Sequence, residues 1–261
     1  MILEGDLYLV EIFSSVQGEG THAGASTLFI RFGECDLRCR WCDTPQSWKP
    51  SAECRIETKR GAGVFSTLAN PVPLSAAVAA VEALELESHR FVSFTGGEPL
   101  LQPEALRALA RELRGRGPRI HLETHGLCAD ALADVLGDID VVSMDWKLAS
   151  DVRRASDPRR GPVEDFHAAH EAFLRVALGA PEVMVKVVVT PASRDAEIDE
   201  MTHRIACVEP EVPVIVQPVT PYGVVRETAS AKRLLALVAR MEKTLRDVRL
   251  IPQTHKLYCA P

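Results

Sequence analysis

The chain has 261 residues, of which 46% are hydrophobic and 25% charged, and its formal net charge at pH 7 is −6. This is the composition of an ordinary globular protein with enough apolar material for a large core. The sequence contains no long block of Lys and Arg of the kind that binds a nucleic-acid backbone, and no apolar stretch long enough to cross a bilayer. We therefore expect small-molecule partners, with no nucleic acid and no membrane.

The first residues, Met1–Asp6, show no cationic stretch followed by an apolar run, so we expect no secretory signal. The seven cysteines are an odd number, which argues against a disulfide framework. We predict a cytoplasmic protein whose thiols stay reduced and are available to metal.

Short β-like runs alternate with amphipathic helical runs along the chain. Several β-like runs are almost continuously apolar, as in parallel strands that are covered on both faces. This alternation predicts parallel βαβ units in an open sheet or a barrel. In chain order we predict strands over 8–13, 27–32, 91–95, 120–124, 141–145, 183–190, 214–217 and 248–251, and helices over 75–87, 103–114, 129–136, 164–178, 195–207 and 230–246.

Two stretches break this rhythm. Residues 47–73 are rich in Gly and Pro and are predicted to form an excursion from the core. Residues 150–162 hold four arginines, two aspartates and two prolines without periodicity, which predicts an exposed loop. We find no internal repeat and predict a single domain over 1–261.

Three cysteines follow the second predicted strand: Cys35, Cys39 and Cys42, with the spacing C-x3-C-x2-C. Three thiolates on one loop can hold three corners of a cubane iron–sulfur cluster and leave the fourth iron open to a ligand. A structural zinc site normally has four ligands, so the spacing matches zinc poorly, although a distant histidine could complete such a site. The other cysteines lack metal-like spacing and are predicted to be free thiols or packing residues: Cys54, Cys128, Cys207 and Cys259.

Polar residues follow several of the predicted strands. In parallel barrels the chemistry gathers at these carboxyl ends. The strand over 91–95 runs into Gly96-Gly97-Glu98-Pro99, where two glycines let the backbone approach a ligand and offer free N–H groups. Polar residues at any one strand end could belong to a solvated loop, but their presence at successive strand ends predicts a single site. The other polar ends are Glu123–Gly126, Ser143–Lys147, Gln217-Pro218 and Gln253–Lys256.

The cysteine triplet followed by Gly-Gly-Glu-Pro resembles the signature pair of the radical S-adenosylmethionine (SAM) enzymes. Within that superfamily the chain resembles the 7-carboxy-7-deazaguanine synthase family, which acts in queuosine and deazapurine biosynthesis. The closer resemblance rests on motifs that span nearly the whole chain: Glu11–Gly20, Phe29–Arg31, Trp41–Thr44, Glu123–Gly126, Gln217-Pro218 and Gln253–Lys256.

The resemblance implies a lyase reaction. Cys35, Cys39 and Cys42 would hold a 4Fe–4S cluster, and the methionine end of SAM would chelate its open iron. Reductive cleavage of SAM would give a 5′-deoxyadenosyl radical, which takes a hydrogen from carbon 6 of 6-carboxy-5,6,7,8-tetrahydropterin. Ring contraction with loss of ammonia would give 7-carboxy-7-deazaguanine, with the cofactor carrying the hard step.

The resemblance also implies a partial, open (β/α) barrel with roughly six parallel core strands. It implies a homodimer and an electron donor such as flavodoxin or ferredoxin. Thr44 would help to bind Mg2+, which takes oxygen ligands.

Further site residues are implied position by position. Arg31 would grip the pterin carboxylate with its two-pronged guanidinium, and Glu98 would place the methionine amine of SAM. The carboxylate of Pro261 would read the aminopyrimidinone edge of the pterin. The full set is Trp41, Asp43, Gly96, Gly97, Glu98, Glu123, Ser143 and Lys147 for SAM, and Val16, Gln17, Gly18, Arg31, Thr95, Gln217, His255 and Pro261 for the pterin.

The sequence departs from the family pattern at three places. Where Ser-Pro-Lys is common, this chain has Ser143-Met-Asp-Trp-Lys147, which leaves the register of Ser and Lys on SAM open by two residues. The stretch 47–73 is longer than the minimal pattern, and Glu34 stands where a small residue is expected. Two rival interpretations remain open at this point: an activase that makes a glycyl radical on a partner protein, and a non-enzymatic, zinc-stabilised interaction module.

Overall fold

The computed structural model describes residues 6–158, 161 and 163–258. One large sheet runs through this part of the chain, in the strand order β12-β11-β10-β8-β7-β6-β2-β1-β4-β5. Its strands are β1 (Leu9–Val16), β2 (Ser26–Phe32), β4 (Glu53–Glu57), β5 (Phe65–Ala69), β6 (Phe91–Gly96), β7 (Arg119–Thr124), β8 (Val141–Asp145), β10 (Glu182–Val189), β11 (Val214–Pro218) and β12 (Val248–Leu250).

Along this order, the seven strands β2, β6, β7, β8, β10, β11 and β12 pair in parallel with one another. β1 pairs antiparallel with β2, and the sheet ends at β5 on one side and at β12 on the other. The prediction of a partial, open barrel with a parallel core is therefore confirmed. The parallel strands are apolar because helices cover their outer face, as β10 with its sequence EVMVKVVV illustrates.

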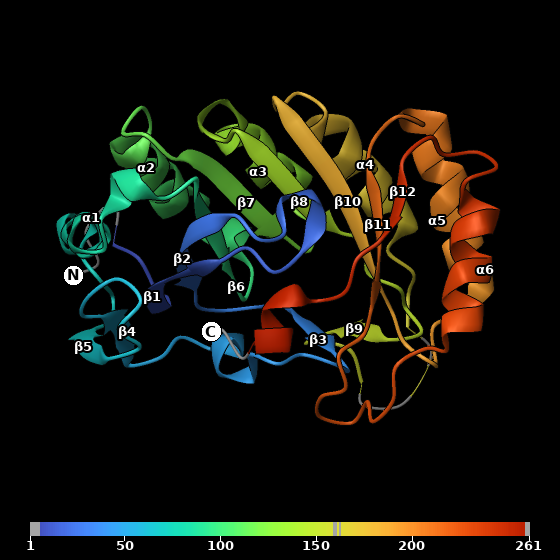
Figure 1. The fold of residues 1–261 in the computed structure, drawn as a ribbon, viewed down its shortest axis with the longest axis horizontal. Helices are drawn as coiled ribbons and strands as arrows, with labels where there is room; N and C mark the ends of the chain where they lie inside the picture. The colour runs from blue at the N-terminus through green and yellow to red at the C-terminus, as the bar shows by residue number, and fades with distance from the viewer. Residues whose placement is uncertain (1–5, 159–160, 162, 259–261) are drawn as a thin grey trace.

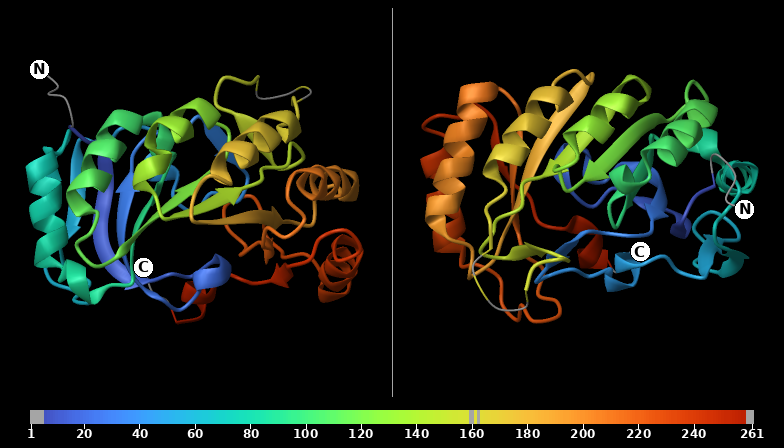
Figure 2. Two further views of the ribbon diagram at one scale, coloured as in Figure 1. Left: turned by 90° about the horizontal axis from the view of Figure 1, so that it is seen from above. Right: turned by 180° about the vertical axis from the view of Figure 1, so that it is seen from behind.

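Six α-helices lie along the outer side of the curved sheet in the described chain (Figures 1 and 2). Each of the six predicted helices is present. α2 shows the reason: Pro103 starts it, and Leu106, Leu109 and Leu113 are fully buried on one face. The helices are α1 (Leu74–Ala83), α2 (Pro103–Leu113), α3 (Ala129–Val135), α4 (His167–Ala177), α5 (Asp195–Val208) and α6 (Ala231–Met241). None of the described helices has the length and apolar character needed to cross a membrane.

The stretch 47–73 is not merely an excursion from the core. It contains the β4–β5 hairpin, which extends the sheet beyond β1, and β4 pairs in parallel with β1. Cys54 and Ile56 alternate with charged residues in β4 and are buried in the main core. A five-residue strand with only two apolar positions carries too weak a pattern to be predicted locally.

The prediction of an exposed loop over 150–162 is wrong for its first part. β9 (Val152–Arg154) pairs antiparallel with β3 (Leu37–Cys39), the strand that carries the second cysteine of the triplet. Asp151 and Val152 are only 2% exposed. Three-residue strands have no periodicity of their own, so this pairing arises only from tertiary contact.

The three cysteines lie in residues 34–44, which we call the cysteine segment. The carboxyl ends of the parallel strands meet this segment and the C-terminal 3-10 helix (Thr254–Tyr258) at one end of the sheet (Figure 1). A sheet that draws strands from both ends of the described chain agrees with the single domain over 1–261, which stays a prediction.

Candidate active site

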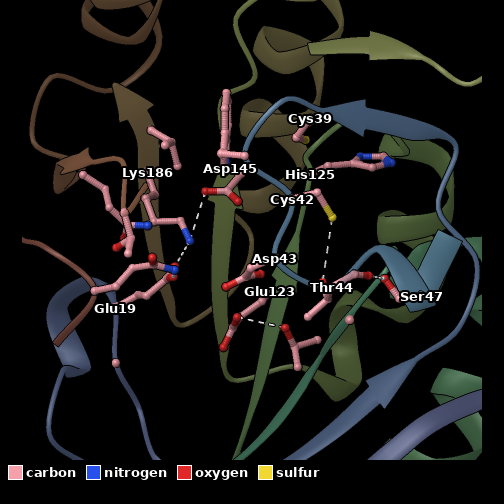
Figure 3. Close-up of a pocket in the computed structure, with 18 of the residues that line it drawn as sticks. Glu19, Cys39, Cys42, Asp43, Thr44, Ser47, Glu123, His125, Asp145 and Lys186 are labelled. Carbon is pink, nitrogen blue, oxygen red and sulfur yellow. Dashed lines mark hydrogen bonds and ion pairs between the residues drawn. The ribbon is translucent and has the colours of Figure 1, made fainter. Parts of the chain in front are cut away.

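A cavity of about 340 Å³ opens at this end of the sheet. It is lined by every predicted site residue within the described chain except Glu98. Pro261 lies outside the described residues. Figure 3 shows side chains from the cysteine segment and from several strand ends converging on this space. The predicted residues on its walls are Val16, Gln17, Gly18, Arg31, Cys35, Cys39, Trp41, Cys42, Asp43, Thr44, Thr95, Gly96, Gly97, Glu123, Ser143, Lys147, Gln217 and His255.

The three cysteines are free thiols that line the same cavity. Burial raises the pKa of Cys35 to about 12 and that of Cys39 to about 11, so a bound cation is needed to hold them as thiolates at neutral pH. Within the described residues no three His, Cys, Asp or Glu side chains converge on a point where one metal ion could sit. A cubane cluster does not require such convergence, because each cysteine binds a different iron. The donor set therefore fits a cluster better than a zinc ion.

The two glycines after β6 fit against the start of the cysteine segment. A Cβ on Gly97 would lie 1.9 Å from the Glu34 carbonyl oxygen, and Gly96 has a φ of 129°. The prediction that the N–H groups here are free is wrong for Gly97, which donates to the Phe32 carbonyl at 3.0 Å. The next N–H, of Glu98, donates to the Glu34 carbonyl at 2.8 Å. The glycines thus fix the distance between strand and cysteine segment.

Glu98 supports the cavity wall from behind. Its side chain is fully buried, Oε1 accepts from Thr124 Oγ1 at 2.8 Å and from Leu100 N at 3.0 Å, and Oε2 accepts from His125 N at 2.8 Å. Glu98 therefore ties the end of β6 to the end of β7. The structure does not bring this carboxylate to the cavity surface, where the resemblance would have it place the SAM amine.

Glu123 is an ionised carboxylate on the cavity wall. It accepts from Gln17 Nε2 at 2.8 Å, Ser93 Oγ at 2.8 Å and Thr95 Oγ1 at 3.0 Å. Burial alone would raise the pKa of Glu123, but the charges of His121 and Lys186 and the hydrogen bonds from Gln17 and Ser93 outweigh burial and lower the pKa. A carboxylate held in this way can accept a further bond from a ligand N–H.

Ser143 in β8 and Lys147 just beyond it both line the cavity. Successive side chains of a strand alternate between its two faces, so Ser143 and Asp145 share one face of β8, and Lys147, two residues beyond the strand, lines the same cavity. This chain has two more residues between Ser and Lys than the Ser-Pro-Lys pattern has, and an even number of added residues leaves the direction of alternating side chains unchanged. Lys147 Nζ lies 2.8 Å from Asp145 Oδ2 and 5.9 Å from the centre of the Trp41 ring in the cysteine segment.

Sequence reasoning missed a buried network of charges beside this segment. Lys186, in the middle of β10, pairs with Glu19 and lies 3.2 Å from Asp145 Oδ1 (Figure 3). Burial opposes the charge on Lys186, but the two carboxylates outweigh it and raise its pKa. Glu19 also accepts from Gln253 Nε2 at 2.7 Å. The available signal was a lone lysine within a run of valines, since a charge there must find partners.

The C-terminal segment forms one wall together with the motif after β1. Thr254 N donates to the Gly18 carbonyl at 2.8 Å, although the two residues are 236 positions apart in the chain. A Cβ on Gly18 would lie 1.7 Å from His255 Nδ1, so only glycine lets this ring pack here. Lys256 Nζ lies 3.0 Å from Asp43 Oδ2. The two motifs that flank the cysteines are thus neighbours in space.

Two further predicted residues show features suited to a polar ligand. Gln217 is 3% exposed, and its Oε1 has no hydrogen-bond partner among the described residues, so a ligand N–H would satisfy it. Arg31 donates through Nε to Glu11 Oε1 at 2.9 Å, which orients the guanidinium, whose Nη groups are further donors. Thr44 Oγ1 lies 4.0 Å from Cys42 Sγ (Figure 3).

Comparison with known proteins identifies the family. The Radical SAM superfamily model matches residues 29–205. The chain is 37% identical over 253 residues to the 7-carboxy-7-deazaguanine synthase of Geobacter sulfurreducens, covering 95% of both chains. It is 35% identical over 260 residues to that of Methanopyrus kandleri, covering 96% of this chain and 93% of the relative.

Solved structures agree on the fold. QueE from Escherichia coli superposes with a TM-score of 0.59 at 21% identity, covering 95% of both chains. A radical SAM methyltransferase from Sphaerobacter thermophilus gives a TM-score of 0.54 at 19% identity, covering 87% of this chain and 66% of that one. The chain therefore belongs to the radical SAM superfamily and, within it, to the 7-carboxy-7-deazaguanine synthases.

Proposed function

We propose that this protein converts 6-carboxy-5,6,7,8-tetrahydropterin to 7-carboxy-7-deazaguanine with loss of ammonia. The observation that carries the proposal is the wall in which Gly18 and Glu19 meet Gln253–His255 beside the three cysteines. The cluster motif is common to many reactions, whereas this wall bounds a cavity of about 340 Å³ whose mixed polar and aromatic lining suits a flat heterocycle.

As a radical SAM enzyme, the protein uses a 4Fe–4S cluster and SAM. We assign the cluster to Cys35, Cys39 and Cys42. With a cluster bound by these cysteines, reductive cleavage of SAM would supply the 5′-deoxyadenosyl radical that takes a hydrogen atom from the substrate. The protein's own part is to orient the reactants and to exclude side reactions.

Lys147 and Trp41 support the assignment of SAM to the side of the cavity beside the cysteine segment. The Lys147 ammonium lies 5.9 Å from the centre of the Trp41 ring, and Ser143 of β8 lines the same cavity. Gly96 and Gly97 set how close β6 comes to the cysteine segment. We propose that these groups bind SAM mainly through charge and ring stacking.

The remaining walls support recognition of a pterin. The Glu123 carboxylate and the unpartnered Gln217 Oε1 are acceptors for ring N–H groups, and the Arg31 guanidinium suits the substrate carboxylate. Val16, Thr95 and His255 complete this pocket. Pro261 stays a candidate for the aminopyrimidinone edge.

We further propose that Thr44 contributes its hydroxyl to a Mg2+ ion, whose other ligands would come from substrate and water oxygens. Flavodoxin or ferredoxin is the proposed electron donor, a homodimer the proposed assembly, and the cytoplasm the proposed location. The rival interpretations, a glycyl-radical activase and a zinc-stabilised module, do not account for the near full-length match to the synthases.

The direct test is to purify and reconstitute the protein without oxygen and to offer it SAM, dithionite and the carboxy-tetrahydropterin. We expect one ammonia and one 7-carboxy-7-deazaguanine per turnover. The matched control is the tetrahydropterin without its 6-carboxylate. If SAM is cleaved but no ammonia is released from the carboxylated substrate, the pterin assignment is wrong and the radical SAM assignment stands.

A further inference from the structure

The backbone after β8 is held from the helix side by two histidines of α4. Trp146 is 1% exposed, and its indole N–H donates to His167 Nδ1 at 3.0 Å. The Trp146 ring also packs on the ring of His170, with 4.9 Å between the centroids. None of these three residues lines the cavity, yet Trp146 directly precedes Lys147, which does.

His170 joins the ends of two neighbouring strands. Its Nδ1 donates to the Gly126 carbonyl beyond β7 at 2.9 Å, and its Nε2 accepts from the Lys147 N–H beyond β8 at 2.9 Å. Only a neutral imidazole with its proton on Nδ1 makes both bonds. His170 is fully buried, and burial lowers its pKa to about 3, so this form is kept at neutral pH.

Both bonded partners are shaped to receive this ring. Gly126 has a φ of 70°, and a Cβ there would lie 3.2 Å from His170 Nδ1 and 3.0 Å from Met144 Cε. On the other side, Trp146 lies buried against His170 of α4, while the next residue, Lys147, lines the cavity. The Lys147 ammonium then meets Asp145 and the Trp41 ring.

We propose that His170, assisted by His167 and Trp146, is a positioning residue for SAM binding, because it sets the backbone of Lys147 at the cavity wall. The proposal rests on the part of the proposed function that assigns Lys147 to SAM. It does not depend on which substrate the radical attacks.

The test compares two substitutions of His170 in the full-length, reconstituted protein. His170→Leu fills similar space but leaves the Gly126 carbonyl and the Lys147 N–H without partners, and we expect the Kd for SAM to rise about tenfold or more. His170→Gln retains one donor and one acceptor, and we expect a Kd within about threefold of the parent value. SAM binding is measured at matched iron content and without pterin, so failure of the pterin assignment leaves this readout intact.

His89 provides the matched control. It is also a buried histidine with two ring bonds, to the Leu84 carbonyl and to Ser26 Oγ, each at 3.0 Å, but it does not line the cavity, and Ser26 begins β2 and is not at its carboxyl end. His89→Leu should lower the stability without changing the Kd for SAM. An unchanged Kd in His170→Leu, or an equal loss of SAM affinity in both Leu variants, would overturn the proposal.

Two measurements keep the proposal testable if His170→Leu does not fold. Trp146→Phe keeps a buried ring and removes the bond to His167, and it should raise the Kd for SAM about threefold. In the metal-free parent protein, the Lys147 amide should exchange with solvent slowly, and in Trp146→Phe markedly faster. Parent-like exchange together with a parent-like Kd in this variant would contradict the proposed role.

Discussion

Two walls of the cavity are built on different physical principles. On one side, Gly96 and Gly97 pack main chain against main chain beside the cysteine segment, with Gly97 close to the Glu34 carbonyl. On the other side, Lys186 sits between two carboxylates in a buried network of charges. The first, which we call the main-chain wall, depends on atomic fit. The second, which we call the charged wall, depends on charge balance, so different substitutions should damage the two walls.

The largest effect is expected at the main-chain wall. Gly97→Ala would place a Cβ 1.9 Å from the Glu34 carbonyl oxygen and 2.9 Å from the Ser47 carbonyl oxygen, and backbone cannot swing aside. We expect a loss of about 3 kcal/mol or more in the free energy of unfolding, measured in urea on the metal-free protein. Gly137→Ala is the control, since a Cβ at Gly137 would meet nothing within 4 Å. Equal free energies of unfolding for the two variants would contradict the close packing of Gly97 against the Glu34 and Ser47 carbonyl oxygens.

Removal of the Lys186 ammonium from the charged wall should lower the free energy of unfolding. Lys186→Met keeps the length of the side chain but leaves Asp145 and Glu19 short of a partner in a buried place. We expect a loss of about 2–3 kcal/mol in the free energy of unfolding. In the control, Arg246→Met breaks an ion pair with Glu211 in which both side chains are at least 70% exposed, and it should cost well under about 1 kcal/mol. A loss in Lys186→Met as small as in this control would mean that the network contributes little.

Acid should weaken the link between the strand ends. The pKa of His170 is lowered from 6.5 to about 3, so below pH 6.5 the unfolded chain binds a proton that the folded chain does not. This stability is therefore present above pH 6.5 and is lost as the pH falls. From pH 7.5 to 5.5 His170 should account for about 1.4 kcal/mol of the loss. Urea unfolding of parent and His170→Leu at both pH values checks this, and parallel losses in the two proteins would disprove it.

The smallest expected effect is a gain at the main-chain wall. Glu34 has a φ of 70°, a conformation that favours glycine and that accounts for the small residue expected at this position. Glu34→Gly should raise the free energy of unfolding by about 0.5–1 kcal/mol in the same urea assay. Glu112→Gly, within α2, is the opposite control and should lower it by about 1 kcal/mol. A loss of stability in Glu34→Gly would show that this side chain stabilises the cysteine segment.

Local pattern was sufficient for the parallel core and for predicting that the polar strand ends line one cavity. The apolar runs and helix starts of the chain predicted β6, β7, β8, β10, β11 and β12 and all six helices, with bounds that differ by a few residues. Strand ends with polar residues predicted which side chains would converge, because parallel strands bring their carboxyl ends to one edge. Resemblance to a family supplied the roles that spacing alone leaves open.

The sequence by itself determined the cysteine triplet, the alternating elements and the polar strand ends, since each is a local or periodic feature. Only the tertiary structure decided that β9 pairs with β3, that Gly97 fits against Glu34, and that Lys186 and His170 find their partners. These contacts join segments far apart in the chain, and a side chain's partner across such a distance has no local signature. The sequence therefore indicates the kind of site, and the tertiary structure determines which side chains hold that site in place.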